Sequence, residues 1–132
     1  MRTTGVPPSP TKPIEMNEMT LHIESNLEAP SLSRTRLASL RSSLEPRYED
    51  VLLVVSELVS NSVRHTNTDD IDVRVESNNG HVRVEVSDGG PGFTESTPRR
   101  DGLGLAIIEK LADKWGIVPS DDRFTVWAEL KL

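Results

Sequence analysis

The sequence contains no cysteine in its 132 residues. This absence excludes disulfide bonds, thiol nucleophiles and cysteine metal sites, and it is consistent with a reducing compartment. There is no apolar run long enough to span a bilayer and no secretory signal pattern, so we expect no membrane contact and a cytoplasmic location. Basic residues are outnumbered, with a formal net charge of -6. Because nucleic-acid backbones select basic surfaces, direct nucleic-acid binding is not expected.

The length of the chain indicates one domain that is large enough for a hydrophobic core. Residues 1–18 are rich in proline and polar residues and show no periodicity, which predicts a flexible tail. Whether this tail is a leader or a functional arm stays open. The folded domain is expected over residues 19–132, and no internal repeat is visible.

Apolar periodicity predicts the first half of the domain. Thr20–Glu24 alternates as a strand does. A helix is expected from Ala29-Pro30-Ser31 to about Leu44, and a second from about Pro46 to His65, with Pro46 in its first turn. The first helix has an apolar face formed by Leu32, Leu37 and Leu40. The second has a stripe formed by Val51, Val55, Leu58 and Ser62 and widened by Leu52, Val59 and Val63.

The second half begins with a hairpin pattern. Residues 71–75 and 82–86 alternate apolar and charged residues, and Asn79-Gly80 between them favours a turn with positive φ. A helix from Leu103 to Trp115, closed by Gly116, and a last strand over residues 124–130 complete the pattern. Together, these predicted strands and helices indicate a two-layer α/β sandwich with a largely antiparallel sheet, which has helices on one face and water on the other.

A polar line crosses the second helix. Glu57 and Asn61 are four residues apart and lie on one helical face, and Arg64 and His65 continue near it. One interpretation is a solvated outer face. In the other, the Asn61 carbonyl oxygen binds magnesium together with water and phosphate oxygens, and Glu57 orients or deprotonates the attacking group. Arg64 or His65 would then meet a phosphate oxygen, although His65 can equally be an ordinary histidine near a helix end.

Asp88 ends the second hairpin strand and is followed directly by Gly89-Gly90-Pro91-Gly92. A carboxylate fixed there can accept a hydrogen bond from an exocyclic amine such as that of adenine. Gly90 and Gly92 let the backbone turn and a flat base approach closely. The alternative is a plain loop of turn-forming residues, but this segment is denser in glycine than a connection needs.

Gly102 and Gly104 precede the third predicted helix. Glycines at a helix start leave amide groups to face phosphates, and the helix dipole adds to the attraction. The spacing is neither that of a P-loop nor a full dinucleotide fingerprint. Residues 94–101 would form a short mobile segment over the nucleotide, with Arg99 and Arg100 near the terminal phosphate. The alternative role of these arginines is solubility.

Together, the three segments resemble the N, G1 and G2 boxes of the GHKL ATPase superfamily, which includes gyrase, histidine kinases and MutL-like proteins. The resemblance covers about Met19 to Leu132 and implies the Bergerat ATP-binding fold, with ATP and Mg²⁺ as cofactors. It implies that Asn61 binds Mg²⁺, Asp88 binds the adenine amine and Glu57 is the general base. The other implied nucleotide-binding residues are Arg64, His65, Gly90, Gly92, Arg100, Gly102, Leu103 and Gly104.

Within the superfamily the chain looks most like the anti-sigma-factor serine/threonine kinases of bacterial partner-switching systems. It has no preceding helical segment with a phospho-accepting histidine, and Arg100 stands where sensor kinases more often have glycine. The resemblance implies a homodimer that phosphorylates an anti-anti-sigma partner and sequesters a sigma factor, and so regulates transcription. Two alternatives stay open: an ATP-sensing interaction module without turnover, and a stand-alone catalytic domain of a sensor histidine kinase.

Overall fold

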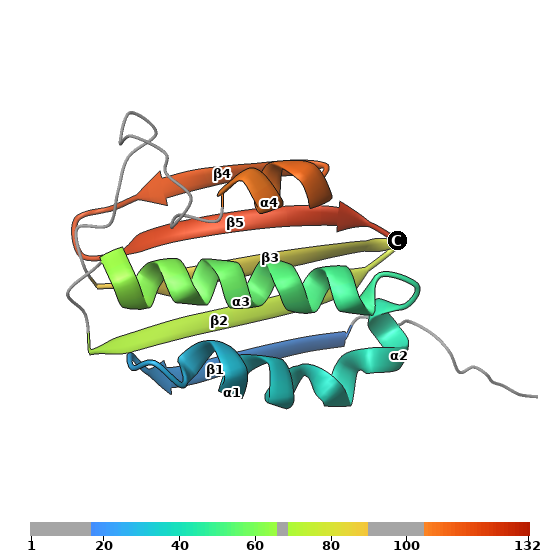
Figure 1. Cartoon of the computed structure of the whole chain (residues 1–132). Coiled ribbons are helices and arrows are strands. Elements are labelled where there is room, and N and C mark those ends of the chain that lie inside the picture. Colours follow the sequence, from blue (N-terminus) through green and yellow to red (C-terminus); the bar gives the residue numbers. More distant parts are fainter. Residues whose placement is uncertain (1–16, 66–68, 90–104) are drawn as a thin grey trace, which may run out of the picture.

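Alternation of apolar and polar residues builds a five-stranded sheet in this protein (Figure 1). The computed structural model describes residues 17–65, 69–89 and 105–132. All neighbouring strands are antiparallel, in the order β1-β2-β3-β5-β4. The strands are β1 (Asn17–Glu24), β2 (Asp70–Asn78), β3 (His81–Asp88), β4 (Lys114–Pro119) and β5 (Phe124–Lys131). The predicted antiparallel sheet is therefore confirmed.

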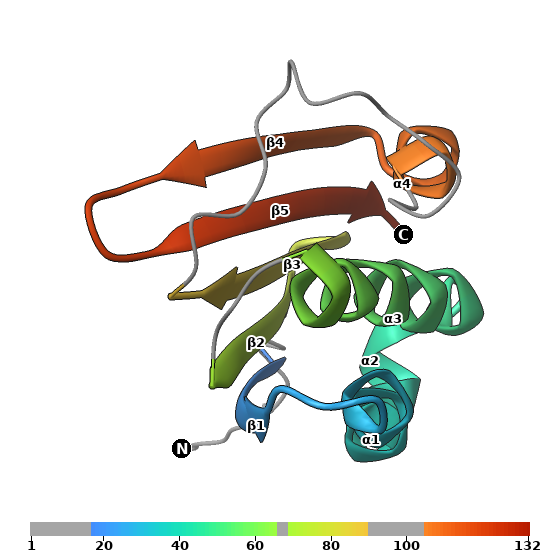
Figure 2. The same ribbon diagram turned by 60° about the vertical axis from the view of Figure 1, so that its left-hand side comes forward.

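Helices cover one face of this sheet and leave the other face open, as Figure 2 shows. They are α1 (Ala29–Arg36), the 3₁₀ helix η2 (Leu37–Leu40), α2 (Arg41–Leu44), α3 (Tyr48–His65) and α4 (Leu105–Leu111). This arrangement confirms the predicted two-layer α/β sandwich. None of the described helices combines the length and apolarity needed to cross a membrane.

The hairpin turn has the backbone that its sequence requires. Asn79 has φ 55° and Gly80 has φ 80°, the left-handed region that asparagine and glycine tolerate. In the register that this turn sets, Val75 pairs with Val84 and Val73 with Val86. Both strands therefore turn their valines to the helices and their charged residues to the open face.

The core lies between the helices and the inner face of the sheet. Val51, Val55, Leu58 and Ser62 of α3 are buried there, as the predicted stripe requires. Leu37 and Leu40 are also buried, but Leu32 is 38% exposed, which corrects its assignment to the same face. Its place inside is taken by Ser33, whose hydroxyl donates to the Ala29 carbonyl and so satisfies its own polar group.

Several predicted boundaries differ from the structure. The helix expected from Ala29 to Leu44 is divided into α1, η2 and α2. Pro46 precedes α3 instead of forming its first turn, because the helix begins at Tyr48. Asn17 and Glu18, assigned to the tail, pair with β2 in β1. The rest of the expected tail, residues 1–16, lies outside the described residues, so its flexibility stays a prediction.

The helix predicted to run to Trp115 was wrong at its end. The helix α4 ends at Leu111, and Trp115 and Gly116 belong to the edge strand β4. Pairing with β5 decides the structure here, because Trp115 lies opposite Ala128 and Gly116 opposite Trp127 in an antiparallel ladder. Gly116 thus serves side-chain packing and is not a helix cap. A Cβ atom at Gly116 would lie 2.9 Å from Trp127 Nε1.

We expect Gly116→Ala to lower the free energy of unfolding by about 1 kcal/mol, since overpacking of this size outweighs the better strand propensity of alanine. Urea unfolding followed by tryptophan fluorescence measures the change. Val118→Ala is the matched control, because Val118 is on the same face of the same strand and is 50% exposed. A Gly116→Ala protein as stable as the wild type would show that the indole shifts without cost.

Candidate functional site

Asp88 continues the inward-facing series of β3. Val82, Val84 and Val86 are buried at alternate positions, and Asp88 is the next residue in that alternation. It pairs with Ile71 of β2 on one side and faces Phe124 of β5 on the other. Its side chain is 1% exposed, so the fold buries a carboxyl group at the end of a central strand. A carboxylate in this position needs polar partners.

One such partner is Ser62 of α3. The Ser62 hydroxyl donates a hydrogen bond of 2.6 Å to Asp88 Oδ2, a length typical of a hydroxyl bound to a carboxylate. This contact joins the helix motif to the strand motif across 26 positions of the chain. Ser62 was not predicted as a site residue, because its helical spacing placed it only in the apolar stripe. The available signal was a hydroxyl in an otherwise apolar stripe, next to Asn61.

Asn61 lies beside Ser62 and is 1% exposed. Glu57, one helical turn earlier, is half-buried, and Arg64 is exposed. Along this part of α3, exposure therefore changes from the half-buried Glu57 to the buried Asn61 and then to the exposed Arg64. His65 ends α3, and its side chain lies outside the described residues. Asn61 is thus the sequence neighbour of the residue that binds Asp88, and Glu57 lies one helical turn before it on α3.

The glycine segments of the predicted site fall outside the described residues. This applies to Gly90, Gly92, Arg100, Gly102, Leu103 and Gly104, and to the expected mobile segment over residues 94–101. The chain is described again from Leu105, which is 3% exposed and begins α4. Both β3 and α4 pack against α3, so the elements on either side of these segments border the same helix.

The donor set suits a magnesium nucleotide. Asp88 supplies a buried acceptor for an amine, and Asn61 supplies a carboxamide oxygen, a ligand type that Mg²⁺ accepts. In the part of the chain that the structure describes, no group of three or more His, Cys, Asp or Glu side chains could hold a metal ion. A magnesium ion held mainly by water and phosphate oxygens does not require such a cluster.

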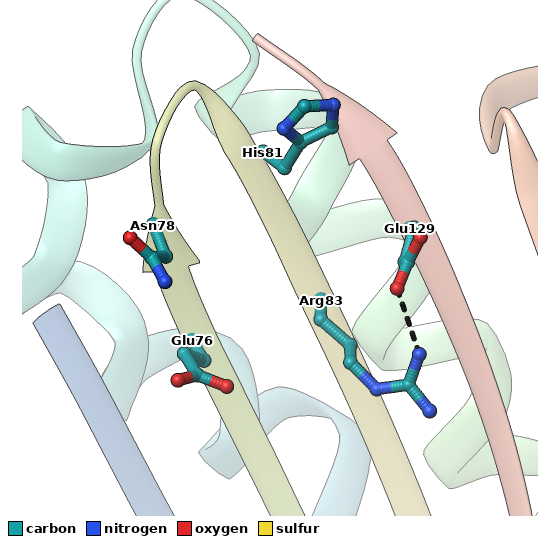
Figure 3. Close-up of a pocket in the computed structure, with 5 residues that line it drawn as sticks. All are labelled: Glu76, Asn78, His81, Arg83 and Glu129. Carbon is teal, nitrogen blue, oxygen red and sulfur yellow. Dashed lines mark hydrogen bonds and ion pairs between the residues drawn. The ribbon is translucent and has the colours of Figure 1, made fainter. Parts of the chain in front are cut away.

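A separate concavity of about 340 Å³ lies on the open face of the sheet (Figure 3). Its lining comes from three adjacent strands and shares no residue with the site at Asp88. The lining residues are Glu76, Asn78, His81, Arg83 and Glu129. Asp88 faces the helices instead, so the concavity and the predicted nucleotide site lie on opposite faces of the sheet.

Arg83 occupies the centre of this open face with its charge compensated. Its guanidinium group donates to Glu85 and to Glu129, at 2.8 Å each, and stacks 4.4 Å from the centre of a Trp127 ring. Burial lowers the pKa of Arg83, but the two carboxylates outweigh it and raise the pKa above its usual value. Arg83 is therefore a permanent cation that holds Trp127 in place.

Comparison with known proteins decides the family. The model of the histidine kinase-like ATPase domain family matches residues 10–129. The chain belongs to this family. The predicted membership of the GHKL ATPases is therefore confirmed, and with it the α/β fold class. This histidine kinase-like ATPase domain spans nearly the whole chain, which includes every residue of the candidate site.

Two named relatives are anti-sigma or kinase proteins. The chain is 30% identical over 117 residues to the anti-sigma F factor of Clostridium botulinum (strain Eklund 17B / Type B), covering 74% of this chain and 81% of that one. It is 31% identical over 120 residues to the serine-protein kinase RsbW of Listeria monocytogenes serotype 4a, covering 74% and 76%. These relatives support placement with the partner-switching anti-sigma kinases of the ATPase family.

Solved structures share the fold. The RsbU and RsbW domains of Rv1364c from Mycobacterium tuberculosis match with a TM-score of 0.68 and 22% identity. That match covers 88% of this chain and 32% of the other, so the chain spans about a third of that protein. The histidine kinase AdeS of Acinetobacter baumannii matches with a TM-score of 0.54 and 13% identity, over 84% and 67% of the two chains.

Proposed function

We propose that the chain is an ATP- and Mg²⁺-dependent protein serine/threonine kinase. It would phosphorylate an anti-anti-sigma protein and sequester a sigma factor in the bacterial cytoplasm. The observation that carries the proposal is the Ser62–Asp88 hydrogen bond. This contact brings the adenine-binding candidate Asp88 to the helix that bears Asn61 and Glu57. The names of the anti-sigma F factor and RsbW relatives support the choice of reaction.

Each residue has a distinct role in this proposal. Asp88 accepts a hydrogen bond from the adenine amine, and Ser62 holds the carboxylate in the orientation to do so. Asn61 contributes its carboxamide oxygen to Mg²⁺, which would neutralise phosphate charge. Burial of both Asp88 and Asn61 limits competition from bulk water for these contacts. Arg64 is exposed, so its side chain would contact the nucleotide or the partner protein at the surface.

Glu57 would act as the general base. It removes the proton from a serine hydroxyl of the partner while that oxygen attacks the terminal phosphorus of ATP. The serine O–P bond forms, the bond from that phosphorus to the bridging oxygen breaks, and ADP leaves with the bridging oxygen. Half-burial suits this role, because the carboxylate must reach a hydroxyl that arrives from another protein. The remaining proposed nucleotide contacts are Gly90, Gly92, Gly102, Gly104, Leu103, His65 and Arg100.

The test uses the purified chain, labelled ATP and candidate anti-anti-sigma proteins from the same cell. Transfer of label to a serine or threonine of one candidate is the expected result. If ATP binds but no candidate gains phosphate, the kinase proposal fails and an ATP-sensing interaction module takes its place. Light scattering with and without ATP would test the homodimer that we also propose.

The identity of the phosphorylated residue distinguishes the proposed serine/threonine kinase from a further alternative. A stand-alone catalytic domain of a sensor histidine kinase would form phosphohistidine, which is lost in acid, whereas phosphoserine survives. Acid treatment of the labelled partner therefore distinguishes the two reactions. We expect the label to persist. The structural likeness to AdeS, at 13% identity, shows the shared fold and does not favour the histidine reaction.

A further inference from the structure

The strand β1 is an unprotected edge of the sheet. The strand order places β1 and β4 at the two edges, where one side of each backbone has no neighbouring strand in the described sheet. β1 pairs with β2 without interruption, from Asn17 opposite Ser77 to Glu24 opposite Asp70, so no bulge bends it away. Its eight residues include no proline and no lysine. Such an edge exposes N–H and C=O groups that readily pair with another strand.

The other edge strand, β4, has the protection that β1 lacks. It has only six residues, begins at Lys114 and ends at Pro119. A lysine on an edge strand disfavours pairing with another chain, and proline has no N–H group to donate. An additional strand is therefore expected at β1 and not at β4.

A second copy of the chain fits the β1 edge because the strand is complementary to itself. A two-fold axis perpendicular to the sheet would pair two β1 strands antiparallel and keep the helices of both copies on one side. If Thr20 lies on this axis, Glu18 of each copy lies opposite His22 of the other. Met19 then lies opposite Leu21 on the helix side. Glu18 and His22 are on the open face, with side chains 41% and 76% exposed.

Charge selects this register among the alternatives. With Leu21 on the axis, Glu18 would face Glu24 of the other copy, and like charges directly opposite each other are destabilising. With His22 on the axis, the two histidines would face each other. Of the two-fold registers that pair most of β1, the one centred on Thr20 places residues of opposite charge opposite each other.

Neighbouring strands extend the charge complementarity. Within each copy, Arg74 Nε donates to Glu18 Oε2 at 2.8 Å, and His22 Nδ1 lies 2.6 Å from Asp72 Oδ1. Arg123 Nη2 donates to the other oxygen of Asp72 at 3.0 Å. Across the proposed axis, the charges would therefore alternate in sign along one line of side chains. A protonated imidazole between two carboxylates can donate from both ring nitrogens.

Apolar side chains beside β1 are also exposed. Leu27, in the turn after β1, is 87% exposed, and Leu32 of α1 is 38% exposed. The helix α1 contacts β1, so a second copy at β1 would bring the two α1 helices near each other. The interface would thus extend from the strands to leucines that a monomer leaves in water.

We propose that two copies of the chain associate through β1 and form one continuous antiparallel sheet. Thr20 lies on the symmetry axis, and Glu18 of each copy pairs with His22 of the other. This inference rests on the homodimer that is part of the proposed function, and it assigns the interface of that dimer.

The experiment is sedimentation equilibrium of the full chain without nucleotide, for the wild type, Glu18→Lys and His22→Glu. The wild type should form dimers. The dissociation constant should rise roughly 10- to 100-fold in each variant, because both symmetry-related pairs change from opposite to like charges. An equimolar mixture of the two variants should recover nearly wild-type affinity. In the mixed dimer the new lysine faces the new glutamate, and the native Glu18 faces the native His22.

Asp122→Lys is the matched control for Glu18→Lys. Asp122 is exposed between β4 and β5, at the opposite side of the sheet from β1. Its replacement changes the net charge by the same amount and should leave the dissociation constant within twofold. Circular dichroism checks that each variant is folded. Two unfolded variants would not restore each other, so recovery in the mixture tests the interface even if one variant loses stability.

Four results overturn the inference. They are dimers of either variant that are as tight as the wild type, no recovery in the mixture, loss of the dimer in Val118→Lys, and a monomeric wild type. Val118→Lys places a charge on β4, so its failure to dimerise would assign the interface to that edge. A monomeric wild type also refutes the proposed homodimer, whereas the other results refute only the β1 interface. Because neither ATP nor a partner protein is present, a failed kinase assay leaves this outcome unaffected.

Discussion

Asp88→Asn is expected to weaken ATP binding roughly 10- to 150-fold. The loss corresponds to about 1.5–3 kcal/mol, the scale of a hydrogen bond to a charged group. Asparagine keeps an oxygen that can accept from Ser62, so the α3–β3 contact should persist and the protein should stay folded. The new amide group would face the adenine amine with a donor in place of an acceptor. Isothermal titration with ATP and Mg²⁺ measures the effect.

The same variant should also change base preference. Guanine presents a carbonyl oxygen where adenine presents its amine, so the ratio of ATP to GTP affinity should fall. Asp72→Asn is the matched control. Asp72 is on the open face, where it accepts from Arg123 at 3.0 Å, and its replacement should leave ATP affinity within twofold. Unchanged ATP affinity in Asp88→Asn would overturn the assignment of the adenine contact.

Glu57→Gln is expected to reduce phosphotransfer roughly 100- to 10,000-fold, the usual contribution of a general base. Glutamine has the same shape but takes no proton from the attacking hydroxyl. ATP affinity should change little, because Glu57 has no assigned contact with the adenine. A single-turnover assay with labelled ATP and the unphosphorylated partner measures phosphotransfer, and an ATP titration measures the affinity.

Glu49→Gln is a suitable control for the loss of one negative charge on α3, since Glu49 is exposed in the first turn of the helix. It should transfer phosphate at the wild-type rate. If Glu57→Gln also transfers at that rate, another group removes the proton. If Glu57→Gln leaves regulation of the partner intact while transfer is lost, the interaction-module alternative gains support.

Much of the fold follows from local patterns in the sequence. The alternating valines at 73, 75, 82, 84 and 86 determine both strands of the hairpin and their buried face. Asn79-Gly80 determines the turn between them, as the two positive φ angles show. The period of α3 likewise predicts its buried stripe. In each case the local preference and the tertiary environment favour the same structure.

The errors arose where a distant partner decided the structure. Nothing near Trp115 and Gly116 indicates that they lie opposite Ala128 and Trp127, so a helix pattern was extended into an edge strand. The role of Ser62 was missed for a related reason. Its partner Asp88 is 26 residues away, and periodicity assigns a position to a face but does not identify what that face touches. The glycine segments stay predictions, because they lie outside the described residues.

The position of β5 between β3 and β4 has a consequence for synthesis on the ribosome. In the described sheet, β4 is hydrogen-bonded to β5 alone, although β4 precedes β5 in the chain. The growing chain can therefore complete the hairpin of β2 and β3 early, but β4 must wait for the strand made after it. Asp88 gains its neighbour on the β5 side only when Phe124 pairs with it. Nucleotide binding during translation would thus be delayed until β5 has emerged from the exit tunnel.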